Sequence, residues 1–191
     1  MATTNAKVED KTRIMVGPAR FSYMNAFTPR AVNDGDKEAY SVTLLIPKTE
    51  VALIKKIKEG IEIATEAGIK KLWKGVKPGP SVFKYPLHDG DVEKPDQEAY
   101  AGMMFVNARN TKKPGVLMRV DNNNVPGTEE AVYSGSYGYA TVQFFPFDKK
   151  GKGVGCSLQN ILKTKDGERL AGGASAEEDF AGFEEAGDDM L

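Results

Sequence analysis

One segment of helical periodicity stands among six segments of strand-like periodicity, and this pattern limits the folds open to the chain. Between residues 49 and 73, Ile, Ala and Leu recur every three or four positions with lysines between them, which predicts one amphipathic helix. We expect Thr49 to cap it and Gly60 or Gly68 to fray or break it. Elsewhere β-rich or alternating runs predict strands. The predicted strands are residues 12–16, 40–46, 103–108, 116–120, 137–147 and 153–162.

Several short strands, one helix between early strands and long loops favour a small β-barrel or sandwich, a group that includes the OB-fold. We predict a mainly β protein: an OB-fold-like five-stranded β-barrel with an inserted amphipathic helix. The 191 residues suit one domain with flexible ends rather than two domains. We expect a flexible N-terminus at residues 1–11, a barrel domain at 12–171 and a disordered acidic tail at 172–191.

The charge of the chain is divided between a basic body and an acidic end. Residues 171–191 carry seven Asp and Glu and no Lys or Arg, which leaves 26 basic and 20 acidic side chains in residues 1–170. Blocks of like charge are typical of disordered interaction tails, so we expect a polyanion-binding domain whose own C-terminus competes for its groove. A purely solubilising tail is the simpler alternative. The tail residues expected to contact partners are Glu177, Glu178, Asp179, Phe180, Phe183, Glu184, Glu185, Asp188 and Asp189.

Cysteine, histidine and apolar runs are too sparse for several other classes of protein. Cys156 is the only cysteine and excludes an internal disulfide, while His88, the only histidine, has no second His or Cys to build a zinc site. No run approaches the roughly 18 apolar residues of a membrane helix, and residues 1–11 are too polar for a signal peptide. We therefore expect no cofactor, no metal and no membrane contact.

A run of carboxylates is the one argument for an enzyme. Five Asp and Glu side chains fall within residues 89–98, directly after His88, a density that would suit Mg²⁺ and phosphodiester cleavage. Their spacing matches no metal motif, and carboxylates crowded with Gly90 and Pro95 are usual in turns. We expect a solvated loop and no catalytic residue, with a metal-dependent nuclease through Asp89 and Asp91 as an alternative.

Aromatic and basic side chains mix in four segments, as single-stranded nucleic acid requires, because rings stack on bases while cations follow the phosphates. In strand 137–147 two tyrosines share one face with polar residues, and the other face is apolar. The segment 105–119 predicts a basic hairpin, residues 20–30 interleave rings with cations, and lysines fill the glycine-flanked loop after residue 148. The expected stacking rings are Tyr23, Phe105, Tyr137 and Tyr139, and the expected phosphate contacts are Arg20, Arg109, Lys112, Lys113, Arg119, Lys149, Lys150 and Lys152.

Several strings in this order and spacing resemble a bacteriophage family of single-stranded DNA-binding proteins that was once a domain of unknown function. The resemblance spans about Arg13 to Phe180. The strings that carry it are ARFSYMN at 19–25, YSVTLLIPK at 40–48, HDGD at 88–91, YSG at 133–135 and DGERL at 166–170.

The resemblance implies an OB-fold barrel that holds single strands and an acidic C-terminal tail that contacts replication enzymes. It implies a non-catalytic, sequence-tolerant protein of phage DNA replication, recombination or repair, acting in the cytoplasm of the infected bacterial host. Homo-oligomers are compatible with this reading. The alternatives are a strand-annealing or recombination-mediator protein, the metal-dependent nuclease and a structural phage protein.

Overall fold

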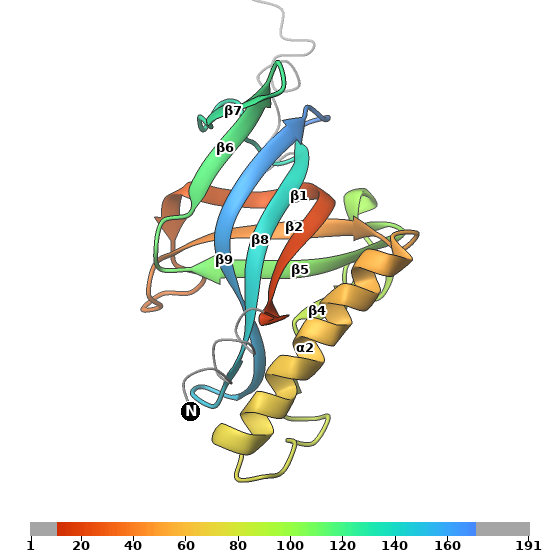
Figure 1. Cartoon of the computed structure of the whole chain (residues 1–191), viewed down its shortest axis with the longest axis vertical. Coiled ribbons are helices and arrows are strands. Elements are labelled where there is room, and N and C mark those ends of the chain that lie inside the picture. Colours follow the sequence, from red (N-terminus) through yellow and green to blue (C-terminus); the bar gives the residue numbers. More distant parts are fainter. Residues whose placement is uncertain (1–10, 171–191) are drawn as a thin grey trace, which may run out of the picture.

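The fold is a closed barrel of five strands, seen in the computed structural model, which describes residues 11–170 (Figure 1). The barrel strands are β1 (Arg13–Arg30), β2 (Ala39–Pro47), β5 (Met103–Asn110), β8 (Tyr137–Phe147) and β9 (Lys152–Lys165). Four antiparallel pairings, β5–β2, β2–β1, β1–β8 and β8–β9, build the sheet, and a parallel contact between β5 and β9 closes it. The expectation of a mainly β, OB-fold-like barrel is confirmed.

Alternation along the barrel strands explains the core. In β8, Gly138, Ala140, Val142 and Phe144 are buried while the residues between them are less so, as expected for a strand with one face inside a barrel. In β2 and β5, Leu44 and Val106 point into the same core. Cys156 lies in this core, and burial raises the pKa of its thiol, so it is a small strand residue rather than a nucleophile.

The first strand is much longer than expected, because β1 covers 18 residues where the sequence predicted residues 12–16. Its first half pairs with β8 and its second half with β2, and Arg20 pairs with both neighbours. Register shifts after Val16 and after Ser22 interrupt the alternation. These irregularities hide the strand from a search for strict period two.

The remaining elements pair with or pack around the barrel strands. They are α2 (Val51–Lys71), β3 (Phe83–Lys84), β4 (Leu87–Asp89), α3 (Gly90–Glu93), the 3₁₀ helix η1 (Glu98–Tyr100), β6 (Gly115–Val120) and β7 (Asn123–Pro126). The predicted hairpin over 105–119 is wrong: β6 pairs with β9 and β7, not with β5. The true hairpin is β6–β7, turned at Asp121 and Asn122, which both have positive φ, and it projects beyond the barrel (Figure 1).

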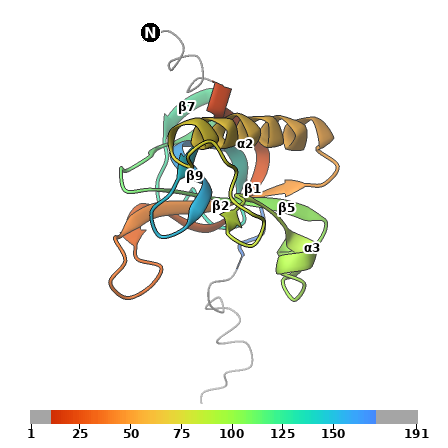
Figure 2. The same ribbon diagram turned by 90° about the horizontal axis from the view of Figure 1, so that it is seen from below.

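Helix α2 packs against β1, β8 and β9 at the end of the barrel opposite the β6–β7 hairpin (Figures 1 and 2). It is continuous from Val51 to Lys71, so the expected break at Gly60 or Gly68 is wrong. Both glycines are buried on the packed face. A Cβ on Gly60 would lie 2.5 Å from Cδ1 of Ile14, so this glycine allows close approach of helix and sheet.

Replacing Gly60 by Val should lower the free energy of unfolding by about 1–3 kcal/mol, because the added methyl groups overlap Ile14 and Phe144. Urea denaturation measures this loss. The matched control is Gly79→Ala, where an added Cβ meets nothing within 4 Å, and its stability should stay close to that of the parent chain. Equal stability of the two variants would contradict the close packing of α2.

Candidate nucleic-acid interface

Tyr23 is the most exposed aromatic ring of the described residues, and an irregularity in β1 presents it. The register of β1 against β2 shifts between Ser22 and Asn25, and Tyr23 there has φ +47°. A bulge of this kind re-aims a side chain away from the regular sheet. The ring is 57 % exposed, and its hydroxyl lies 3.5 Å from Oε1 of Gln97.

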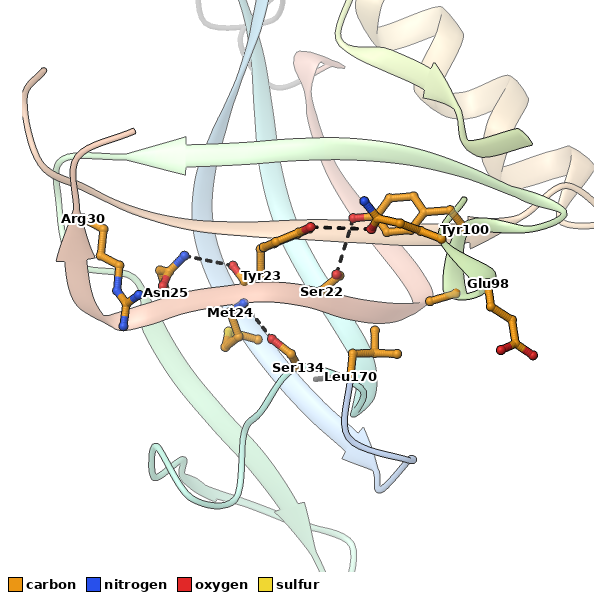
Figure 3. A pocket seen from close by; sticks show the side chains of 11 residues that line it. Ser22, Tyr23, Met24, Asn25, Arg30, Glu98, Tyr100, Ser134 and Leu170 are labelled. Carbon is orange, nitrogen blue, oxygen red and sulfur yellow. Dashed lines mark hydrogen bonds between the residues drawn. The ribbon is translucent and has the colours of Figure 1, made fainter. Parts of the chain in front are cut away.

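A groove of about 440 Å³ adjoins this bulge (Figure 3). Residues 22–25 and Arg30 of β1 form one side, residues 97–100 form another, and Ser134 and Leu170 complete it. The hydroxyl of Ser134 accepts a hydrogen bond from the backbone N–H of Met24 at 2.9 Å. The groove thus combines an exposed ring, a cation, amides and hydroxyls.

Three rings pack together next to the groove, and one of them, Tyr100, lines it. The ring of Phe105 stacks on His88 with centroids 5.0 Å apart and meets Tyr100 edge-on at 5.2 Å. Tyr100 is 2 % exposed, its hydroxyl lies 3.4 Å from Oγ of Ser22, and burial raises its pKa. Phe105 is only 3 % exposed, so its ring packs against the neighbouring rings and has little surface left on which a base could stack.

A lysine clamp holds the segment that carries Tyr100. The ammonium of Lys48 contacts carboxylate oxygens of Asp89 and Asp91, each at 2.7 Å, and lowers the pKa of both carboxyls. Asp91 also accepts a hydrogen bond from the backbone N–H of Gly102 at 2.8 Å. A Cβ on Gly90 would lie 2.4 Å from the backbone oxygen of Tyr100. Within residues 88–96, Gly90 is therefore buried against Tyr100 and the two carboxylates are paired with Lys48, while the segment from Asp91 to Asp96 stays largely exposed, as expected for a solvated loop.

These ion pairs disfavour the nuclease alternative, because Asp89 and Asp91, its proposed metal ligands, are both paired with Lys48. Among residues 11–170, no group of three or more His, Cys, Asp or Glu side chains is placed to hold a metal ion. The motif HDGD is accounted for by packing around η1.

The outer face of β2 and β5 continues the groove as a polar surface. One row across the sheet joins Asn25 of β1, Ser41 of β2 and Arg109 of β5. In the next row Oγ1 of Thr43 donates to Oδ1 of Asn107 at 2.7 Å. In OB-folds this strand pair and two adjoining loops form the ligand face.

Two predicted phosphate contacts, Arg109 and Lys150, meet at the loop between β1 and β2. The guanidinium of Arg109 donates to the backbone oxygen of Lys37, and the ammonium of Lys150 lies 3.9 Å from Asp36. A hydrogen bond from Asn33, and then the positive charge of Lys150, lower the pKa of Asp36. Lys150 is 90 % exposed, so its charge is available to a ligand.

A separate aromatic and basic cluster surrounds Tyr137. The cations of Arg20 and Lys165 lie 5.5 and 5.8 Å from the centre of its ring. Arg20 also donates to the backbone oxygens of Gly135 (3.2 Å) and Glu168 (2.8 Å). These two hydrogen bonds join residues 166–170 to residues 133–136, and the guanidinium carries further N–H groups besides those that they use.

The other predicted residues do not gather at the groove. Tyr139 lies half-buried against Gly17, whose added Cβ would be 2.4 Å from its ring. Arg119, on the β6–β7 hairpin, donates to Asn124 at 3.2 Å. Lys149 and Lys152 lie exposed at the β8–β9 turn. Lys112 and Lys113 line a second cavity.

The list of expected contacts omitted Asn25 and Ser41, and it also omitted Arg30, although Arg30 belongs to the segment 20–30 in which rings and cations mix. Recognising that β1 continues to residue 30 would have placed Asn25 and Arg30 beside Tyr23 on the same strand. Ser41 has no signal in the sequence, because it is a small polar residue whose position depends on the pairing of β2 with β1 and β5.

The predicted partner-binding residues, from Glu177 to Asp189, and residues 1–10 of the N-terminus that was predicted to be flexible lie outside the described residues. Within residues 11–170, none of the helices combines the length and the apolar character needed to cross a membrane.

Comparisons with known proteins fit this architecture. The sequence profile of the family described as Enterobacter phage Enc34, ssDNA-binding protein, matches residues 12–191. Putative protein p50 of Acyrthosiphon pisum secondary endosymbiont phage 1 is 34 % identical over 175 residues, which is 87 % of this chain and 91 % of that protein.

Solved structures of phage single-stranded DNA-binding proteins are also similar to this chain. The single-stranded DNA-binding protein from bacteriophage Enc34 in complex with ssDNA superposes with a TM-score of 0.73 at 30 % identity, over 84 % of this chain and 90 % of the other. For gp2.5, a single-stranded DNA-binding protein encoded by bacteriophage T7, the TM-score is 0.56 at 15 % identity, over 94 % and 98 % of the chains. At that identity the likeness concerns the fold alone.

The barrel and its polar, aromatic groove define a protein of the OB-fold class. Within that class, the chain belongs to the family of phage single-stranded DNA-binding proteins represented by Enterobacter phage Enc34.

Proposed function

We propose that this chain binds single-stranded DNA without sequence preference, in the groove beside Tyr23 and over the outer face of β2 and β5. The observation that carries the proposal is the exposed ring of Tyr23, presented by a bulge next to a groove with Arg30. Family membership and the DNA complex of the Enc34 protein support it.

Binding would combine stacking with phosphate contacts. A base stacked on Tyr23 would contribute about 1–3 kcal/mol. Arg30 ends β1 and lines the groove, while Arg109 and Lys150 contact the loop that follows it, so the three cations would meet the phosphates around this loop. Arg20 and Tyr137 lie outside the groove and serve mainly to anchor residues 166–170. Because every base has a ring face that can stack on Tyr23, stacking does not depend on sequence, and we propose sequence tolerance for this reason.

Fluorescence-anisotropy titration with single-stranded and duplex oligonucleotides tests this function. We expect tighter binding to single strands and a negative slope of log affinity against log salt, with about 0.7 per phosphate contact on a single strand. Lack of binding at low salt would reject the function and favour a structural phage protein. Rapid pairing of complementary strands in an annealing assay would instead identify an annealing or mediator protein.

We propose that the acidic tail competes with DNA for this groove and recruits replication or recombination enzymes once DNA displaces it. Leu170, the last described residue, lines the groove and donates its backbone N–H to the oxygen of Ser134 at 2.9 Å. The first tail carboxylate, at Glu177, is seven residues further on and thus within about 25 Å of that point. The protein would act inside the infected host cell.

A form of the chain that ends at Gly172 should bind a single-stranded oligonucleotide more tightly than the full chain at low salt, by about two- to tenfold. This is the gain expected when an internal competitor of about 0.5–1.4 kcal/mol is removed. Anisotropy titration of both forms measures the difference, and it should shrink as salt rises because the competition is between charges. Equal affinity at every salt concentration would show that the tail does not occupy the groove.

A further inference from the structure

A second cavity, of about 350 Å³, lies where β5, β9 and the start of β1 meet. Three cations and three amides line it, together with Gly115: Arg13, Lys112, Lys113, Asn110, Gln159 and Asn160. No carboxylate lines this cavity in the described part of the chain. Its chemistry therefore suits an anion.

The amides of this cavity are held by hydrogen bonds, whereas its three cations form no ion pair among the described residues. Asn110 donates to Oγ of Ser157 (3.1 Å) and to the backbone oxygen of Leu158 (2.9 Å), which fixes the start of the lysine-bearing loop. Its own Oδ1 accepts from the backbone N–H of Lys112 at 3.0 Å. None of the ion pairs within residues 11–170 involves Arg13, Lys112 or Lys113, so their charges are uncompensated.

A continuous polar row joins this cavity to the groove. Asn25, which lines the groove, is paired with Ser41, Ser41 with Arg109, and Arg109 with Ser157. Ser157 is the hydrogen-bond partner of Asn110 at the cavity. From Asn25 to Ser157 the row crosses three interstrand spacings, or about 14 Å. Arg109 lies between Ser41 and Ser157 in this row.

We propose that this cavity, which we call the Arg13 pocket, is a second site for a phosphate of the same DNA strand, so that the strand leaves the groove, crosses β2 and β5, and ends at Arg13. The guanidinium of Arg13 suits a phosphodiester because it can donate two parallel hydrogen bonds to it. Lys112 and Lys113 add charge from the loop above. This inference rests on the proposed function and extends it, because it predicts a longer footprint than the groove alone provides.

Oligonucleotide length separates the two sites. A strand of about five nucleotides covers only the groove, whereas about 16 nucleotides reaches the upper range for one OB-fold and spans both. In a chain carrying R13Q, K112Q and K113Q, we expect about a tenfold loss for the long strand, a flattening of its salt slope by about 2, and no change for the short strand. The matched control carries K55Q, K56Q and K58Q on the exposed face of α2 and removes the same charge.

Each outcome has a distinct meaning. If the parent chain binds neither length at low salt, the proposed function itself fails. If the triple variant loses both lengths equally, or loses no more than the α2 control, the Arg13 pocket is not a phosphate site. If the loss disappears when both chains end at Gly172, the pocket holds the acidic tail and the proposal is wrong. An unchanged melting temperature of the variant excludes misfolding as the cause of a loss.

Discussion

Replacing Tyr23 by Ala should weaken binding of single-stranded DNA about 5- to 150-fold, which corresponds to the about 1–3 kcal/mol of one stacked base. Tyr23 is the exposed ring beside the groove, so its loss removes the stacking surface without removing a charge. The salt slope should therefore stay the same while the affinity falls. Stability should change little, because a Cβ is present in both residues and the positive φ strains them alike.

Two further variants sharpen this prediction. Tyr23→Phe should bind nearly as well as the parent chain, since the hydroxyl makes only a 3.5 Å contact with Gln97 and the ring carries the stacking. Tyr85→Ala removes a ring that is 41 % exposed but lies outside the groove, and it should leave affinity unchanged. If Tyr85→Ala weakens binding as much as Tyr23→Ala does, the strand does not lie in this groove.

Replacing Phe105 by Ala should lower the free energy of unfolding by about 3–5 kcal/mol, as for a buried aromatic residue. Phe105 lies between His88 and Tyr100 and packs on Leu45, so the truncation empties the cluster that supports one side of the groove. Thermal or urea denaturation measures the loss.

The variant Phe105→Leu decides between a structural and a DNA-stacking role for this ring. Leu keeps most of the apolar volume, so its cost should be below about 1.5 kcal/mol. If Phe105 is a support, Phe105→Leu should bind single-stranded DNA as the parent chain does. A large loss of affinity in this stable variant would return Phe105 to the list of base contacts and contradict its burial.

The fold was predictable from the sequence because its strongest signals are long and regular. The alternation in 137–147 and the helical spacing in 49–73 correspond to β8 and α2 almost residue for residue. The predictions that failed concern places where tertiary contacts override the local sequence pattern. Gly60 would weaken an isolated helix, yet here it permits contact with Ile14. The apparent 105–119 hairpin is absent because β6 finds its partner in β9, far along the chain.

The site was less predictable because composition does not distinguish exposed rings from supporting ones. Tyr23 and Phe105 look equivalent in sequence. A bulge exposes Tyr23, whereas contacts with two neighbouring rings bury Phe105. Arg20 and Arg109 were expected to contact phosphates, and both also donate to backbone oxygens. The clamp of Lys48 on Asp89 and Asp91 joins residues some forty positions apart, a pairing that no local motif encodes.

The path of the strand can be measured directly by photocrosslinking. An oligonucleotide with 5-iodouracil at successive positions would be irradiated on the full chain, and the crosslinked residues identified by mass spectrometry. The groove predicts crosslinks at Tyr23, and flanking positions of the strand should crosslink to peptides that contain residues 41 and 109. Crosslinks concentrated at Tyr139 or Phe145, with none at Tyr23, would place the strand on the other face of the barrel and contradict the account.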